Sequence, residues 1–348
     1  MHRLSSFFSN RSLGGLFPRL ALAAIWMPGN GPQATPSIMA PASTPAHEIH
    51  ALSYFVLSVT GGIFLVVAGL LTYAIIKFRA KDSDWNTEPA QIYGSTQIEL
   101  AWTVIPVLIV IVLFLTTARL IFAIQDAPEP PSALNVMVIG HQFWWEFRYP
   151  SFGIVTANEL HVPLSSDRSQ VPTYLSLLSA DVDHSFWVPQ LAGKTDLIPN
   201  HPNSTWINPL QPGMYIGQCA QFCGAQHALM LLRVYVDTPE QFAAWVKNQQ
   251  LPAVEDPSVI AGRQIFETQA CINCHTIQGT VATGRFGPDL THLMSRQTLA
   301  AGAMANNPAN LRQWIKDPDT FKSGCLMPAM QLSDQQLDQV TAYLLTLR

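Results

Sequence analysis

Residues 214–236 read MYIGQCAQFCGAQHALMLLRVYV, and this stretch decides how the centre of the chain folds. It contains two apolar runs, 214–219 and 228–236, on either side of a short loop. Apolar runs of this length, rich in aromatic and branched residues, predict β-strands. Four side chains with metal-binding chemistry lie in or beside the loop: Cys219, Cys223, His227 and Met230. We therefore expect these side chains to converge in one turn between two strands.

The chemistry of this loop indicates copper. Thiolate and thioether are soft ligands and imidazole is borderline, a set that suits copper. Two thiolates, Cys219 and Cys223, can bridge two copper ions, each of which needs its own imidazole. His227 supplies one, and His184, 35 residues before Cys219, is the candidate for the other. Two alternatives stay open. A disulfide leaves His227 and Met230 without a role, and a zinc site of the Cys2His2 kind has little use for Met230.

Further strand-like runs lie on the N-terminal side of the loop. Residues 134–140, 143–149 and 172–179 are rich in Val, Leu and aromatic side chains, and Gly, Pro and Asn separate them. This pattern predicts an antiparallel β-sandwich or barrel, to which we assign residues 124–240. Residues 241–258, with two prolines, are expected to be a linker.

The C-terminal part carries a haem motif. Residues 271–275 read CINCH, the signature of a covalently attached c-type haem. Cys271 and Cys274 can form the thioether bonds, and His275 can be the proximal ligand. A thioredoxin-like or zinc motif is the alternative, but no βαβ pattern surrounds this segment. Met327, 52 residues after His275, is the expected sixth ligand, and Met330 is its rival.

The size and periodicity of residues 259–348 fit a single haem domain. A helical stretch over 259–268 opens it, and a helix capped by Ser333 closes it, with apolar residues at helical spacing on one face: Leu337, Val340 and Leu344. We expect an all-α domain. Cys325, the fifth cysteine, is expected to act as a small buried hydrophobic residue.

Two apolar stretches near the N-terminus indicate membrane spans. Residues 51–76 form a run of 26 without a charged side chain, and residues 100–118 form a second run of 19. At about 1.5 Å per residue the longer run exceeds the roughly 30 Å hydrocarbon core of a bilayer. Pro106 lies near the start of the second run, where a missing N–H costs least. We therefore predict a helical hairpin over 47–123.

Basic residues between the two runs set the expected topology. Lys77, Arg79 and Lys81 lie in this link, so the positive-inside rule makes it cytoplasmic and puts the rest of the chain outside. The N-terminus must then cross as well. Residues 1–46 are expected to be a leader, because basic residues before a short apolar run resemble a signal peptide. Its last part, 28–46, is expected to be a disordered spacer.

The composition agrees with a chain that lies partly in lipid. Its 348 residues suffice for two or three domains, and 48% are hydrophobic while only 12% are charged. The net charge of −4 excludes a general nucleic-acid binder, which needs a basic face.

Charge is distributed unevenly between the two outer domains. Residues 124–258 carry five Lys/Arg against twelve Asp/Glu, a net −7, whereas residues 259–348 carry seven against six, a net +1. These charges predict a weak and reversible contact between the two domains, with Asp181 and Asp183 as candidate docking acids.

Together these features resemble subunit II of the haem–copper cytochrome c oxidases, of the kind with a cytochrome c domain fused to its C-terminus. The resemblance runs from about residue 47 to the end. It rests on the hairpin, on Gly140-His141-Gln142, on the His184 segment with Lys194-Thr195-Asp196, on the loop 219–230 and on the CINCH motif. It implies a cupredoxin-like Greek-key sandwich that holds a binuclear CuA centre, followed by a class I cytochrome c domain.

The resemblance also implies a ligand set. The CuA ligands are then the side chains of the five residues His184, Cys219, Cys223, His227 and Met230. Residue 221 contributes its backbone carbonyl. Family members commonly have Glu there, and its carboxylate helps hold a magnesium ion at the border with subunit I. Here the residue is Gln221. The carbonyl ligand survives that change, but the magnesium ion is in question.

Three further positions match family features. Glu99 matches the acid at the cytoplasmic mouth of a proton pathway in subunit I, although a helix-start carboxylate is the alternative. Phe143, followed by Trp144, stands where many relatives have the Trp that receives electrons from soluble cytochrome c. Pro288, in Gly-Pro-Asp-Leu, matches the proline whose carbonyl orients the proximal histidine, here His275.

The implied function is electron transfer from haem c to CuA and on to subunit I, which reduces dioxygen to water. The chain is then part of a proton-translocating oxidoreductase without itself holding the oxygen-reducing site. Expected partners are subunit I, subunit III, membrane lipid and a donor that is an upstream cytochrome or quinol-oxidising complex. The expected location is the bacterial inner membrane, with two spans and both outer domains on the periplasmic side. The alternatives are a membrane-anchored shuttle for another reductase and a copper chaperone for oxidase assembly.

Overall fold

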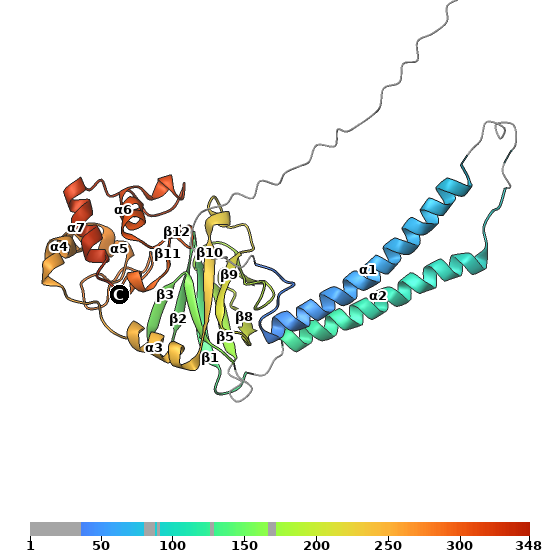
Figure 1. The fold of residues 1–348 in the computed structure, drawn as a ribbon, viewed down its shortest axis with the longest axis horizontal. Coiled ribbons are helices and arrows are strands. Elements are labelled where there is room, and N and C mark those ends of the chain that lie inside the picture. Colours follow the sequence, from blue (N-terminus) through green and yellow to red (C-terminus); the bar gives the residue numbers. More distant parts are fainter. Residues whose placement is uncertain (1–35, 80–87, 89–90, 126–128, 166–171) are drawn as a thin grey trace, which may run out of the picture. The chain divides into compact units, whose positions relative to one another are not determined.

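The structure is a computed structural model that describes residues 36–79, 88, 91–125, 129–165 and 172–348. The expected signal peptide lies outside the described residues. Two long helices come first, α1 (Thr44–Lys77) and α2 (Thr96–Gln125) (Figure 1). At 34 and 30 residues both exceed the roughly 30 Å needed to cross a bilayer, and both are apolar. The predicted pair of apolar helices is confirmed.

Both helices extend beyond the apolar runs, and this changes two expectations. Because α2 begins at Thr96, Pro106 lies inside the helix rather than near its start. Residues 28–46 were expected to be a spacer, but Ala42 and Ser43 before α1 and Ala46 in its first turn are buried. The Ser43 hydroxyl accepts a hydrogen bond from the backbone N–H of Asn208, which attaches this segment to the following domain.

The next domain is a β-sandwich of two five-stranded sheets, as predicted (Figure 1). The first sheet has the strand order β3 (Ile154–Ala157), β2 (Trp144–Tyr149), β1 (Leu134–His141), β5 (Thr173–Ser179) and β8 (Asn203–Ile207). The second has the order β4 (Glu159–Pro163), β10 (Leu231–Asp237), β9 (Gly213–Cys219), β6 (His184–Trp187) and β7 (Thr195–Leu197).

The sheets are mixed rather than antiparallel. β1 pairs with β5 and β4 pairs with β10 in parallel, while the other strand pairs are antiparallel. Strand periodicity reports which face of a strand is buried but not which strand is its neighbour, so it could not predict these pairings. The two inner faces supply the core, with fully buried side chains such as Trp145, Leu175, Leu177 and Leu232.

Helix α3 (Pro239–Gln249) follows the sandwich and occupies the first half of the predicted linker 241–258. Thr238 caps it, with its hydroxyl accepting from the Gln241 N–H and the Gln241 side chain bonding back in a capping box. Phe242 lies in the sandwich core, which explains why the segment is an ordered helix rather than a linker.

The C-terminal domain contains α4 (Ile260–Thr268), α5 (Cys271–Cys274), α6 (Pro308–Lys316) and α7 (Asp334–Leu344). Ser333 caps α7 as predicted, and the three apolar residues predicted for one face of α7 are buried. α4 packs on α7 at Gly262, where a Cβ atom would lie 2.0 Å from the Gln339 carbonyl oxygen. A short ribbon of β11 (Thr298–Leu299) and β12 (Met304–Ala305) adds to the expected helices.

Candidate metal centre and cofactor cavity

The strands of the second sheet bring the candidate copper ligands together. Cys219 is the last residue of β9, and Met230 immediately precedes β10, its antiparallel partner. Between them a short 3-10 helix, His227–Leu229, turns the loop back on itself. His184 begins β6, which pairs with β9 so that Phe186 lies opposite Cys219. All five predicted side-chain ligands therefore meet at one end of the sheet.

The donor atoms are spaced for shared coordination. The Cys219 and Cys223 sulfurs are 3.9 Å apart, and His184 Nδ1 lies 3.8 Å from the Cys219 sulfur. His227 Nδ1 lies 3.7 Å and Met230 Sδ 3.9 Å from the Cys223 sulfur. Donors around one ion at about 2.0–2.3 Å are separated by distances of this order. All five cysteines of the chain are free, so no disulfide joins Cys219 and Cys223.

The two thiols influence each other strongly. A hydrogen bond from Cys223, together with the His184 side chain, lowers the pKa of Cys219. The pKa of Cys223 is raised, first by its contact with Cys219 and then by burial. The two buried sulfurs lie in one cluster with His184, a donor set that fits soft metal ions sharing both sulfurs.

Neighbouring residues hold the ligands in place. The Asp181 carboxylate lies 2.7 Å from His184 Nε2 and leaves Nδ1 free to face Cys219. Gly140 leaves room for that imidazole, because a Cβ atom there would lie 2.8 Å from the His184 ring. The Trp145 indole N–H donates to the Met230 carbonyl at 3.4 Å.

Asp181, a candidate docking acid, also forms hydrogen bonds within its own domain. Its second carboxylate oxygen accepts from the Gln142 backbone N–H at 2.6 Å. The Gln142 side chain in turn donates to the Cys223 carbonyl at 2.6 Å. The Gln221 carbonyl lies 3.2 Å from the Cys219 sulfur, where the family ligand is expected, and its side chain is exposed.

The CINCH motif forms the floor of a second site. Cys271 and Cys274 lie on α5, and His275 follows directly. His275 Nδ1 lies 2.7 Å from the Pro288 carbonyl oxygen, the contact that the resemblance implied. Gly287 permits this close approach, since a Cβ atom there would lie 2.7 Å from the imidazole. Burial lowers the pKa of His275, which favours the neutral imidazole that ligates iron.

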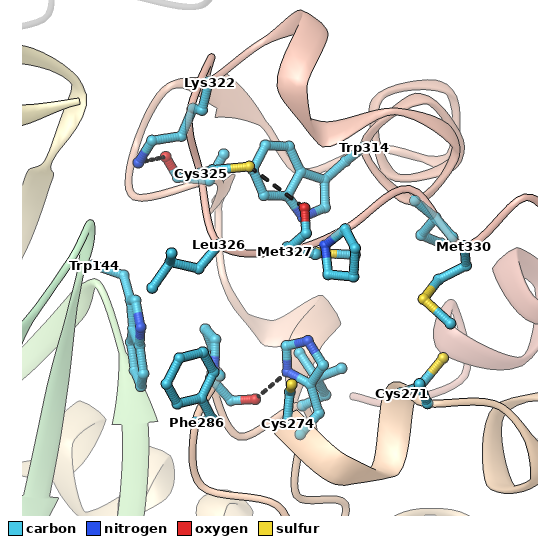
Figure 2. A pocket seen from close by; sticks show the side chains of 18 of the residues that line it. Trp144, Cys271, Cys274, Phe286, Trp314, Lys322, Cys325, Leu326, Met327 and Met330 are labelled. Carbon is cyan, nitrogen blue, oxygen red and sulfur yellow. Dashed lines mark hydrogen bonds between the residues drawn. The ribbon is translucent and has the colours of Figure 1, made fainter. Parts of the chain in front are cut away.

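Above the motif lies a cavity of about 280 Å³ (Figure 2). Cys271, Cys274, His275, Met327 and Met330 all line it. Met327 and His275 also line a smaller cavity of about 80 Å³, which Met330 does not reach. The larger cavity is walled mostly by apolar side chains, as a haem macrocycle requires.

A buried arginine lies where it could bind the propionate groups of a haem. Arg296 lines the smaller cavity and is 8% exposed. One of its terminal nitrogens donates to the Asp289 carbonyl, whereas its buried Nε has no partner among the described residues. An unpaired buried donor beside the cavity suits a haem propionate. Sequence reasoning missed Arg296, because a single basic residue outside any motif gives no signal.

The remaining predicted residues lie at two places, on α2 and at the large cavity. Glu99 is exposed in the first turn of α2. Phe143 is 8% exposed and lines the large cavity together with Trp144, whose ring stacks on His141. Cys325 is only half-buried; it lines the same cavity, and its thiol donates to the Met327 carbonyl.

Two apolar helices, a β-sandwich with a soft-donor cluster and a helical domain with a haem cavity define a membrane-anchored electron-transfer protein. Comparison with known sequences agrees with each part. The profile of the cytochrome c oxidase subunit II transmembrane domain matches residues 32–120, that of its periplasmic domain matches 167–236, and that of cytochrome c matches 259–348.

Among curated proteins, cytochrome c oxidase subunit 2 of Alkalihalophilus pseudofirmus is 35% identical over 82% of this chain and 82% of its own length. Subunit 2 of a Bacillus species is also 35% identical, over 78% of this chain and 80% of its own. The chain therefore belongs to the cytochrome c oxidase subunit II family, whose members of this kind carry copper and haem c.

Among solved structures, the periplasmic domain of subunit II of cytochrome oxidase from Bradyrhizobium japonicum is 28% identical. That match covers 35% of this chain and 97% of that one, with a TM-score of 0.33.

Proposed function

We propose that this chain is the subunit at which electrons enter a terminal oxidase, passing from haem c to a binuclear CuA centre and then to subunit I. The relatives at 35% identity are named as subunit 2 of cytochrome c oxidase, and each of the three domains has a counterpart in that family or in cytochrome c. The oxygen-reducing site belongs to subunit I in this proposal.

One observation best supports electron transfer from haem c directly to the copper centre within this chain. Gln142, Phe143 and Trp144 belong to the copper domain, yet they line the cavity above the CINCH motif. Figure 2 shows Trp144 at its wall. The Gln142 side chain donates to the carbonyl of Cys223, one of the two proposed bridging ligands. A short path of bonded and hydrogen-bonded atoms thus runs from the wall of the haem cavity to the copper cluster.

Bound haem and copper would supply one-electron redox chemistry, and the chain supplies their environment. His275, held by the Pro288 carbonyl, keeps one orientation, as does His184, held by Asp181. Buried ligands limit the movement that accompanies a change of charge, since Cys219, Cys223 and Met230 are each less than 5% exposed. We assign Met327 as the thioether that would hold the haem iron, because it lines both cavities together with His275.

The same proposal assigns the membrane location of the chain and its partner proteins. Helices α1 and α2 anchor the chain in the bacterial inner membrane beside subunit I and subunit III, with both outer domains on the periplasmic side. An upstream cytochrome or quinol-oxidising complex supplies the electrons. In the same proposal Glu99, in the first turn of α2, serves the cytoplasmic mouth of a proton pathway in subunit I. With Gln221 in place of Glu, magnesium lacks one carboxylate ligand and is left out of the proposal.

Metal analysis with electron paramagnetic resonance tests the proposal on the purified oxidase. Two coppers per haem c in this chain and a seven-line hyperfine pattern, from one unpaired electron shared by two copper nuclei, are expected. Cys219→Ser and Cys223→Ser should each remove the pattern, because both thiolates would be shared by the two proposed ions. Cys325→Ser, at a thiol outside the cluster, should keep it. A four-line pattern with one copper per chain would disprove the binuclear centre.

A further inference from the structure

A buried lysine joins the two outer domains. Lys322 belongs to the cytochrome c domain, and its side chain is 2% exposed. Its ammonium donates to three backbone carbonyls, those of Phe143 at 2.9 Å, Leu229 at 3.0 Å and Ala300 at 3.2 Å. Phe143 and Leu229 belong to the copper domain. An ammonium has three N–H donors, so this arrangement uses all of them.

Two of the three carbonyls that Lys322 contacts flank the copper cluster. Leu229 directly precedes the predicted ligand Met230, and Phe143 follows Gln142, whose side chain bonds the Cys223 carbonyl. Lys322 also lines the haem cavity, five residues before Met327 (Figure 2). Burial lowers the pKa of Lys322 to about 8, so the ammonium form still prevails at neutral pH.

A second buried charge holds the same interface from the opposite domain. Glu159, on β4 of the copper domain, is 2% exposed. Its carboxylate accepts from the backbone N–H groups of Gln297 and Thr298 and from the Thr298 hydroxyl, at 2.9–3.0 Å. Arg233 of the copper domain donates to the same hydroxyl at 2.7 Å.

These contacts differ from the weak, reversible contact that the net charges of the two domains predict. A charge taken out of water is expensive unless polar partners meet it in one geometry, so a buried ammonium and a buried carboxylate are matched only in a single docked arrangement. Net charge, by contrast, counts exposed and buried groups alike and carries no information on geometry.

We propose that Lys322 is a positioning residue, which fixes the haem-binding segment against the copper loop so that electrons pass between the centres in one fixed arrangement of the two domains. The inference rests on the proposed function, since it concerns the route from haem to CuA. Glu159 holds the far side of the same interface.

Hydrogen–deuterium exchange on the purified oxidase tests the positioning role and does not depend on an activity assay. Lys322→Met keeps the length of the side chain but removes its donors. The Thr298 and Leu231 amides, which bond Glu159 and the Ala301 carbonyl across the interface, should lose roughly tenfold or more of their protection. The Leu337 amide, bonded to Ser333 inside the cytochrome c domain, should keep its protection.

Lys316→Met is the matched control, because it removes the same charge from an exposed position in the same domain. Haem-to-CuA transfer after flash reduction should slow in Lys322→Met and become dependent on viscosity, while the haem and copper spectra stay unchanged. In Lys316→Met the transfer rate and its dependence on viscosity should be the same as in the unmodified oxidase.

Glu159→Gln provides a second variant, should Lys322→Met fail to assemble. Its amide keeps one acceptor oxygen but replaces the other with an NH2 donor, which would face the Gln297 N–H, so interface protection should fall in the same way. If either variant keeps full interface protection and the original transfer rate, the positioning role is wrong. An oxidase without haem or without the shared copper signal would instead disprove the proposed function itself.

Discussion

The Asp181 carboxylate lies 2.7 Å from Nε2 of His184, whose other ring nitrogen faces the Cys219 sulfur at 3.8 Å. One nitrogen of the imidazole is thus reserved for the carboxylate and the other for metal. This pairing fixes both the tautomer and the orientation of a predicted ligand.

Asp181→Asn should therefore weaken copper binding while the sandwich stays folded. An amide holds the imidazole less firmly, and loss of such a partner typically costs about 10–100-fold in metal affinity. Copper retained against increasing concentrations of a chelator measures the effect. Asp183→Asn, at an exposed acid two residues away, is the control and should retain copper normally. Equal loss in both variants would assign the effect to charge rather than to the hydrogen bond.

The axial haem ligand can be tested with two methionines three residues apart. Met327→Leu should remove the weak near-infrared sulfur-to-iron band and lower the reduction potential, because a thioether stabilises ferrous haem. Met330→Leu should leave both nearly unchanged, since Met330 does not reach the smaller cavity that Met327 and His275 share. Redox titration with optical spectra measures both, and the reverse pattern would assign the ligand to Met330.

Gly262 should tolerate no side chain. A Cβ atom there would lie 2.0 Å from the Gln339 carbonyl oxygen of α7, and backbone cannot move aside as a flexible side chain can. Gly262→Ala should destabilise the cytochrome c domain by about 1–3 kcal/mol, the usual cost of overpacking. Thermal unfolding followed by haem absorbance checks this. Ala261→Ser, at the exposed neighbouring position, should change the transition little.

Glu146 should contribute a pH-dependent part of the sandwich's stability. Burial alone raises the pKa of its carboxyl, but hydrogen bonds from His141 and Arg148 outweigh burial and bring the pKa below its usual value. The folded state therefore binds the proton less tightly than the unfolded state. This stabilisation is present above the unfolded pKa of about 4.5 and is lost as pH falls through the lower folded pKa.

The unfolding temperature of the detergent-solubilised chain, measured from neutral to acid pH, tests that sign. Glu146→Gln should lower the unfolding temperature at neutral pH, and the difference from the unmodified chain should shrink as pH falls. A difference that stays constant with pH would mean that Glu146 acts through packing alone.

Short-range features of this protein were predictable from the sequence. Cys219, Cys223, His227 and Met230 lie within one loop, so their spacing alone brings them together once the flanking runs pair as strands. The CINCH motif and the cap at Ser333 are local in the same way, because their partners lie within a few residues. Length and apolar composition likewise determined helices α1 and α2.

Only the tertiary structure decided which distant groups meet. Glu159 and Thr298 are 139 residues apart, and Lys322 lies 179 residues from Phe143, so no periodicity or spacing relates them. The helical part of the predicted linker depended in the same way on Phe242 finding the sandwich core. Local sequence patterns carry information about contacts between residues that are close in the sequence. Contacts between domains depend on how two folded surfaces fit together, which local patterns do not encode.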